Sequence, residues 1–240
     1  MFIHQGKKRT AKHNLQIASL LSFVAGIVNV AGFLAVAKLT TNVTGHFAFF
    51  VDEVFKLKFW EGFIYFLYIF FFFLGSFSSS LLVEILSRKN ENYVYIVPTS
   101  IECLILILIA VFGGDLVVDS PNLIAFSLLF AMGLQNSLVT RISNATVRTT
   151  HLTGLFTDLG IELSQLFFYR EDETRKKLIA SVKLRLTIIS FFFIGGIIGG
   201  IFYSGIGLHV LLIGSASLIL GIIYDNIKLK IKLLRKKYRH

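Results

Sequence analysis

Polar side chains that could bind a ligand recur at matching positions in two stretches of the chain. The first stretch reads GIVN and then TTNVTG, which ends at Gly45. The second reads GLQN and then TTHLTG, which ends at Gly154. A glutamate follows eight residues after each of these glycines, at Glu53 and Glu162. A repeat of this length predicts two related halves of one membrane protein.

The neutral polar groups of the two stretches suit a small polar or anionic molecule. An amide inside an apolar span is costly unless it bonds to another helix or lines a wet cavity. Threonine hydroxyls and the backbone groups of a broken helix can also bind a solute. We therefore predict one binding site between the halves, formed by Asn29, Thr41, Thr44, His46, Gln135, Asn136, His151 and Thr153. The alternative is that the amides join helices and the threonines cap helix ends at the membrane surface.

Two carboxylates in the second stretch could couple transport to an ion. Asp158 and Glu162 lie four residues apart, so they share one face of a helix. They could carry a proton or cation, or bind a metal together with His151; the alternative is an ordinary solvated face. Glu102, in the apolar run Tyr93–Val111, is a weaker candidate. The chain has no zinc-site spacing, phosphate loop or nucleophile elbow, so we expect no metal, no cofactor and no enzymatic activity.

The elements that position these residues are expected to be membrane helices. Hydrophobic residues make up 55% of the chain and charged residues 16%, which is too little charge for a soluble protein of this length. A spanning helix needs about 20 mostly apolar residues. Six stretches qualify: Leu15–Ala37, Trp60–Leu86, Tyr93–Val111, Leu123–Val139, Leu186–Tyr203 and Ile206–Tyr224.

The distribution of charge predicts the orientation of these spans. Lysines and arginines gather before the first span and after the second, fourth and sixth, whereas the links after the third and fifth contain none. Only the link after the first span departs from this pattern, with Lys38, Lys56 and Lys58. The positive-inside rule therefore predicts that both termini are cytoplasmic and that the protein lies in the inner membrane. The net charge of +10 is explained by this clustering, so we expect no nucleic-acid partner.

Each half holds an odd number of spans, so the two halves should have opposite topology. We assign residues 15–118 to the first half, 123–226 to the second and 227–240 to a basic cytoplasmic tail. Inverted repeats of this kind occur in secondary transporters. Each Thr-Gly segment should break its helix, and the spacing of apolar residues predicts an amphipathic helix over Leu152–Phe168. Glycines four apart at Gly195/Gly199 and Gly196/Gly200 predict close helix packing, within the chain or in a homodimer.

The two stretches also carry a family resemblance. The blocks SFVAGIVNVAGFLAV, TTNVTGHF and GLQNSLVTRISNATVRTTHLTGLFTDLGIEL resemble the YoaK-like family, a domain-of-unknown-function family of bacterial integral membrane proteins. The resemblance extends from about Leu15 to Tyr224. In the first block, Asn29 and the sequence VTGH replace an acidic residue and a Met-Thr-Gly-Asn motif, which puts an acidic coupling residue in the first span in doubt. The resemblance implies a bacterial membrane protein and no particular activity.

Together these features predict an all-α bundle of six spans in two inverted three-helix repeats. The favoured function is transport of a small polar solute or ion, with the lipid bilayer as surroundings. The first alternative is a membrane scaffold or regulatory protein that transports nothing, and the second is a membrane-embedded enzyme.

Overall fold

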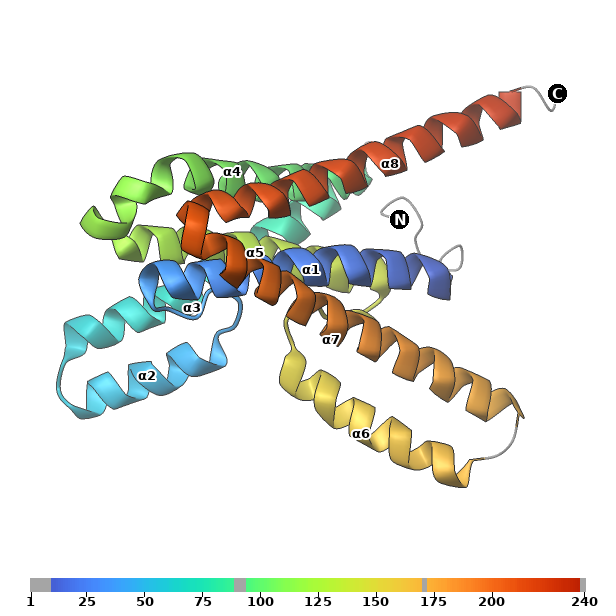
Figure 1. Cartoon of the computed structure of the whole chain (residues 1–240), viewed down its shortest axis with the longest axis horizontal. Coiled ribbons are helices and arrows are strands. Elements are labelled where there is room, and N and C mark those ends of the chain that lie inside the picture. Colours follow the sequence, from blue (N-terminus) through green and yellow to red (C-terminus); the bar gives the residue numbers. More distant parts are fainter. Residues whose placement is uncertain (1–9, 89–93, 170–171, 238–240) are drawn as a thin grey trace.

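Every regular element in the described part of the chain is a helix (Figure 1). The computed structural model describes residues 10–88, 94–169 and 172–237. Its elements are α1 (Ala11–Val36), α2 (Thr44–Phe55), α3 (Phe59–Ser87), α4 (Ile96–Asp119), α5 (Pro121–Ser143), α6 (Leu152–Phe168), α7 (Asp172–Ile206), the short 3-10 helix η2 (Gly207–Val210) and α8 (Leu211–Lys237).

Five helical segments in the described residues are long and apolar enough to cross a membrane. Four of them are α1, α3, α4 and α5, and the fifth is the stretch Asp172–Lys228, which contains α7, η2 and most of α8. The chain is therefore an all-helical, multi-pass membrane protein. We predicted two spans within the last stretch, and that division stays a prediction.

Helices α1 and α5 form the centre of the molecule. In each of them 61% of the apolar window is buried, against 22% in α3 and 33% in α4. The two helices run in opposite directions, and the other helices surround them (Figure 1). Small residues such as Ala18, Ala25 and Ala131 are fully buried on this pair, which lets neighbouring helices approach closely.

Glycines bring α7 against α1. A Cβ atom on Gly26 would collide with the backbone oxygen of Phe192, and one on Gly195 would collide with the backbone oxygen of Phe23. A Cβ atom on Gly199 would lie 3.1 Å from the Cα of Ile27. The predicted close packing around Gly195 and Gly199 is therefore confirmed within the chain.

The same kind of contact joins α3 to α5. A Cβ atom on Gly133 would collide with the backbone oxygen of Phe72, and one on Gly75 would collide with that of Phe130. The hydroxyl of Ser76 donates a hydrogen bond of 3.1 Å to the carbonyl oxygen of Gly133. Each central helix is thus paired closely with one outer helix, α1 with α7 and α5 with α3.

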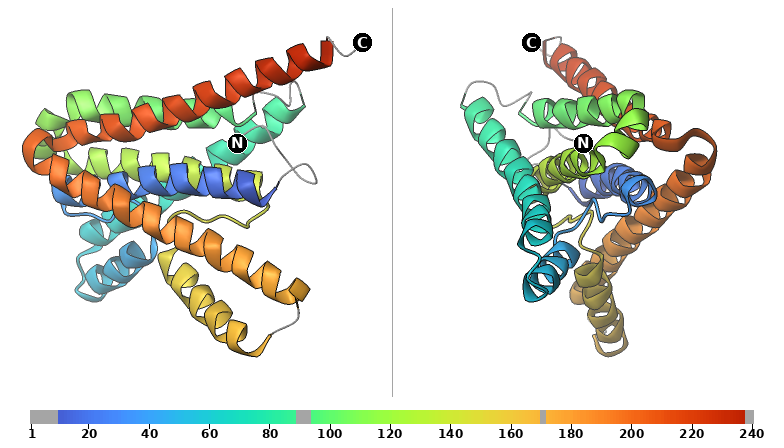
Figure 2. Two further views of the ribbon diagram at one scale, coloured as in Figure 1. Left: turned by 45° about the vertical axis from the view of Figure 1, so that its right-hand side comes forward. Right: turned by 90° about the vertical axis from the view of Figure 1, so that its left-hand side faces the viewer.

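A break and a hairpin follow each central helix. Helix α1 ends before Ala37, which has φ = 50°, and α5 ends before Asn144, which has φ = 56°. The linkers 37–43 and 144–151 lead into α2 and α6, which fold back against α3 and α7. Helices α2 and α6 lie on the far side of α3 and α7, away from the central pair (Figure 2). The predicted helix breaks are confirmed, and α6 has the predicted bounds.

Candidate functional site

The linker after α1 is held against that helix by two threonines. Thr41 Oγ1 donates a hydrogen bond of 2.7 Å to Asn29 Oδ1, and Thr40 Oγ1 donates one of 3.0 Å to the carbonyl oxygen of Val28. Both threonine side chains are buried. Such bonds satisfy polar groups that would be costly to leave unpaired inside a membrane protein.

The linker after α5 is held in a closely similar way. Thr150 Oγ1 donates a hydrogen bond of 2.9 Å to Asn136 Oδ1. The amide nitrogen of Gln135 donates to Thr149 Oγ1 at 3.2 Å and to the carbonyl oxygen of Leu21 on α1 at 3.1 Å. Gln135 is fully buried. Asn136 and Asn29 are therefore each bonded to a threonine of their own half, and among the described residues no hydrogen bond joins the two asparagines.

His46 is buried under the first hairpin. Its Nε2 atom donates a hydrogen bond of 2.6 Å to the carbonyl oxygen of Leu39, and its ring lies 4.7 Å from that of Tyr68, centroid to centroid. Burial lowers the pKa of His46. The hydrogen bond to Leu39 raises it and the positive charge of Lys38 lowers it, so that the pKa is lowered overall. The ring is therefore neutral near pH 7. Thr44, the other predicted site residue of this hairpin, begins α2 and is exposed.

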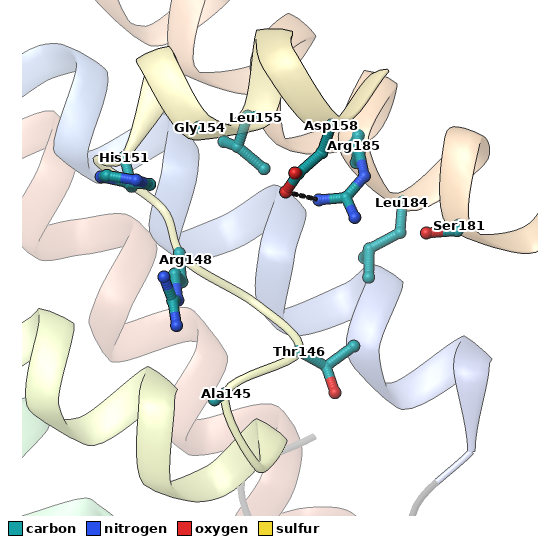
Figure 3. Close-up of a pocket in the computed structure, with 10 residues that line it drawn as sticks. All are labelled: Ala145, Thr146, Arg148, His151, Gly154, Leu155, Asp158, Ser181, Leu184 and Arg185. Carbon is teal, nitrogen blue, oxygen red and sulfur yellow. Dashed lines mark ion pairs between the residues drawn. The ribbon is translucent and has the colours of Figure 1, made fainter. Parts of the chain in front are cut away.

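A pocket of about 400 Å³ lies between linker 144–151, α6 and α7 (Figure 3). Two of the predicted site residues, His151 and Asp158, line it. Its polar lining consists of Thr146, Arg148, His151, Asp158, Ser181 and Arg185. Thr153, the second residue of α6, is exposed and is outside this lining. The pocket thus brings together only His151 and Asp158 of the predicted residues in the described part of the chain, and the predicted residues of the first half lie elsewhere.

An ion-pair cluster closes one side of the pocket. The Nη1 atom of Arg185 lies 2.9 Å from Asp158 Oδ2, and its Nε and Nη2 atoms each lie 2.8 Å from an oxygen of Glu162. Ser181 donates a further hydrogen bond of 2.7 Å to Glu162. Burial raises the pKa of Glu162, but the bonds from Arg185 and Ser181 outweigh it and lower that pKa overall. Glu162 is therefore a carboxylate that holds α6 to α7.

Arg148 is the second arginine that lines the pocket, and its surroundings differ from those of Arg185. It lies in linker 144–151, its side chain is exposed, and in the described part of the chain it has no hydrogen-bond or ion-pair partner. Sequence reasoning treated Arg148 and Arg185 only as charges that set the membrane orientation. A usable signal was present for Arg185, because it directly precedes the predicted fifth span and the preceding amphipathic helix carries two carboxylates on one face.

Two further predictions from the sequence concern metal binding and Glu102. Among the residues that the structure describes, no group of three or more His, Cys, Asp or Glu side chains could hold a metal ion. Glu102 on α4 is fully buried, and neither of its carboxyl oxygens has a hydrogen-bond partner. It lies outside the pocket lining.

Comparison with known proteins assigns a family. Residues 17–224 match the model of a family described as a protein of unknown function, DUF1275. No curated protein and no solved structure matches the chain. The matched region contains most of α1, all of α5, both Thr-Gly segments and the pocket. The expected resemblance to an uncharacterised family is confirmed, and the chain belongs to the DUF1275 family.

Proposed function

We propose that this protein transports a small polar solute or ion across the bacterial inner membrane. Two halves of opposite topology would expose a site to the two sides in turn, as inverted repeats do in secondary transporters. The observation that carries the proposal is the correspondence between the contacts of the two halves, together with a polar pocket beside one of the helix breaks.

The correspondence is seen first in the helix pairs. Helix α1 packs on α7, and its counterpart α5 packs on α3, so each central helix pairs with an outer helix of the other half. In both pairs, glycines of one helix pack directly against backbone oxygens of the other. The bond from Thr41 to Asn29 corresponds to the bond from Thr150 to Asn136. Because α1 and α5 run in opposite directions (Figure 1), a relation between the halves would be an inverted one.

Six spans follow from the same correspondence. Helix α8 turns back beside α4 after η2, where Gly207 has φ = 57° (Figure 2). We therefore infer that α7 and α8 cross the membrane separately, as α3 and α4 do. The start of α1 and the end of α8 lie at the same end of the molecule (Figure 1), in keeping with two cytoplasmic termini.

The hairpins supply the solute path in this proposal. Helices α2 and α6 both begin toward the middle of the molecule and run outward to opposite ends (Figure 1). The start of a helix carries a partial positive charge and unpaired N–H groups, which suit polar or anionic ligands. The pocket between linker 144–151, α6 and α7 would be the site as it is reached from the cytoplasm.

Uptake into liposomes tests the proposal. Purified protein is first screened for polar metabolites that raise its melting temperature, and each one found is then supplied in labelled form to proteoliposomes. We expect uptake above that of protein-free liposomes. Thr146→Trp, which fills the pocket from an exposed position, should abolish it, whereas Ser164→Trp on the exposed side of α6 should not. Binding without any uptake would instead favour a scaffold or regulatory protein.

A further inference from the structure

We propose that the pocket between linker 144–151, α6 and α7 binds one singly charged oxyanion, the carboxylate of a small acid or a phosphate monoanion, through Arg148. The inference rests on the proposed function, because it names the class of solute for the same pocket. It depends on the balance of charge around the pocket and on where the polar groups lie.

One cation of the pocket has no ion-pair partner among the described residues, although the charges of the pocket and its ion-pair cluster sum to zero. Arg185 is offset by the carboxylates of Asp158 and Glu162, which lie 2.9 Å and 2.8 Å from its nitrogen atoms. Among the described residues, none neutralises Arg148. The pocket and the cluster behind it therefore carry two arginines against two carboxylates, and the arginine without a partner is the one free to bind an anion.

The polar groups surround the pocket from both sides. Figure 3 shows Arg148 and His151 on the linker side and Arg185 and Ser181 on the α7 side. Gly154 also lines the pocket, in the first turn of α6. The first backbone N–H to bond back within this turn is that of Leu155, which donates to the carbonyl oxygen of His151 at 3.1 Å. The N–H groups before it have no partner within the helix, and they add a partial positive charge beside Arg148.

The same residues restrict the charge of the ligand. Asp158 lines the pocket with its side chain half exposed. Its carboxylate would repel a second negative charge on a ligand that already contacts Arg148. A volume of about 400 Å³ accommodates a small molecule. The chemistry therefore favours a small monocarboxylate over a dicarboxylate of similar size, and it also allows the single phosphate charge of a phosphatidylglycerol head group.

Melting curves of the full chain in a neutral detergent test this assignment. The probes are sodium acetate, its neutral isostere acetamide, and sodium succinate, each at an ionic strength held constant with sodium chloride. A ligand that binds only the folded protein raises the melting temperature with concentration. We expect acetate to raise it, acetamide to have no effect, and succinate to bind no more tightly than acetate.

Variants then assign the effect to Arg148. Because a hydrogen bond to a charged group contributes substantially to binding, Arg148→Gln should weaken the affinity for acetate on the order of tenfold or more. Arg148→Lys should keep part of the affinity, since it keeps the charge but loses the planar fork. Arg175→Gln removes the same charge from the exposed first turn of α7, outside the pocket, and should leave the affinity unchanged. Thr146→Trp should block binding by filling the pocket.

A second arm of the experiment distinguishes a free solute from a lipid head group as the source of the oxyanion. The wild-type protein and Arg148→Gln are compared in nanodiscs of phosphatidylcholine and of phosphatidylglycerol. If acetate raises the melting temperature of the wild type but not of Arg148→Gln, the site belongs to a free solute. If only phosphatidylglycerol has this effect, the site belongs to lipid. The inference is overturned if acetamide acts like acetate, or if Arg148→Gln responds as the wild type does in both arms. Acetate binding through Arg148 without uptake in liposomes would leave this inference standing and reject only the transport function.

Discussion

The carboxylate of Glu162 receives three hydrogen bonds from α7, two from Arg185 and one from Ser181. Its side chain is 14% exposed and that of Arg185 is 21% exposed, so water screens this ion pair less than it would a pair at the surface. Asp158 completes the cluster at 2.9 Å. Within the second hairpin, Arg185 and Ser181 therefore join α6 to α7.

Replacing Glu162 should show how much this cluster stabilises the protein. Glu162→Gln should lower the free energy of unfolding by about 1–2 kcal/mol, since it weakens charged hydrogen bonds while Asp158 still pairs with Arg185. The pKa of Glu162 is lowered in the folded protein from its ordinary value of 4.5. Its contribution is therefore complete above that value and is lost as the pH falls below it. Melting temperatures between pH 7 and pH 4 measure the difference.

The matched control is Glu173→Gln, because Glu173 is 85% exposed and forms an ion pair with Lys177 one turn away in the same helix. Such a pair contributes little, so this variant should melt as the wild type does at every pH. A gap between Glu162→Gln and wild type that stays constant as the pH falls would contradict the ion-pair account.

At this scale the sequence predicted some contacts and missed others. The bonds of Asn29 and Asn136 join residues 12 and 14 positions apart around a helix break, and the repeated motifs singled out the asparagine and the threonine segment in both halves. The contacts of Arg185 with Asp158 and Glu162 depend on how the second hairpin folds back, and no local pattern encodes that. The proposal for Arg148 depends on its having no ion-pair partner among the described residues, which only the packed structure reveals.

At the scale of the helices, four glycines set the distances within the two close pairs. At Gly26 and Gly195 in one pair, and at Gly75 and Gly133 in the other, an added Cβ atom would collide with a backbone oxygen. A backbone oxygen cannot rotate away as a flexible side chain can, so the helices themselves would have to separate. The apolar periodicity predicted which segments are helical, and it predicted the bounds of α6. It could not predict that α2 and α6 lie on the far side of α3 and α7, because that follows from helix packing.

Gly133→Ala should therefore destabilise the protein, although alanine is the better helix former. Overpacking of this kind costs about 1–3 kcal/mol, and we expect a lower melting temperature and a smaller monodisperse fraction in detergent. The control is Gly114→Ala on α4, where no atom lies within 4 Å of the added methyl group. That variant should be neutral or slightly more stable. Equal melting temperatures for both variants would mean that α3 and α5 are not held this closely.

At the scale of the whole molecule, the proposed transport function depends on two halves that enter the membrane from opposite sides. The crosswise pairing of α1 with α7 and α5 with α3 joins the halves, so movement of one half relative to the other would involve both glycine contacts. The approximate positions of the apolar helices could be read from the sequence, and the division of Asp172–Lys228 into two spans stays a prediction. Their partners could not, because each central helix pairs with an outer helix distant in the chain.

Cysteine labelling of the two hairpin tips tests this central claim most directly. In a Cys103→Ala background, which removes the single native thiol, one cysteine replaces Lys58 at the start of α3 or Glu173 at the start of α7. Both side chains are exposed, at 57% and 85%. A membrane-impermeant maleimide is added to right-side-out and to inside-out vesicles. The account predicts labelling of Lys58→Cys only from outside and of Glu173→Cys only from the cytoplasmic side; labelling of both from the same side would contradict it.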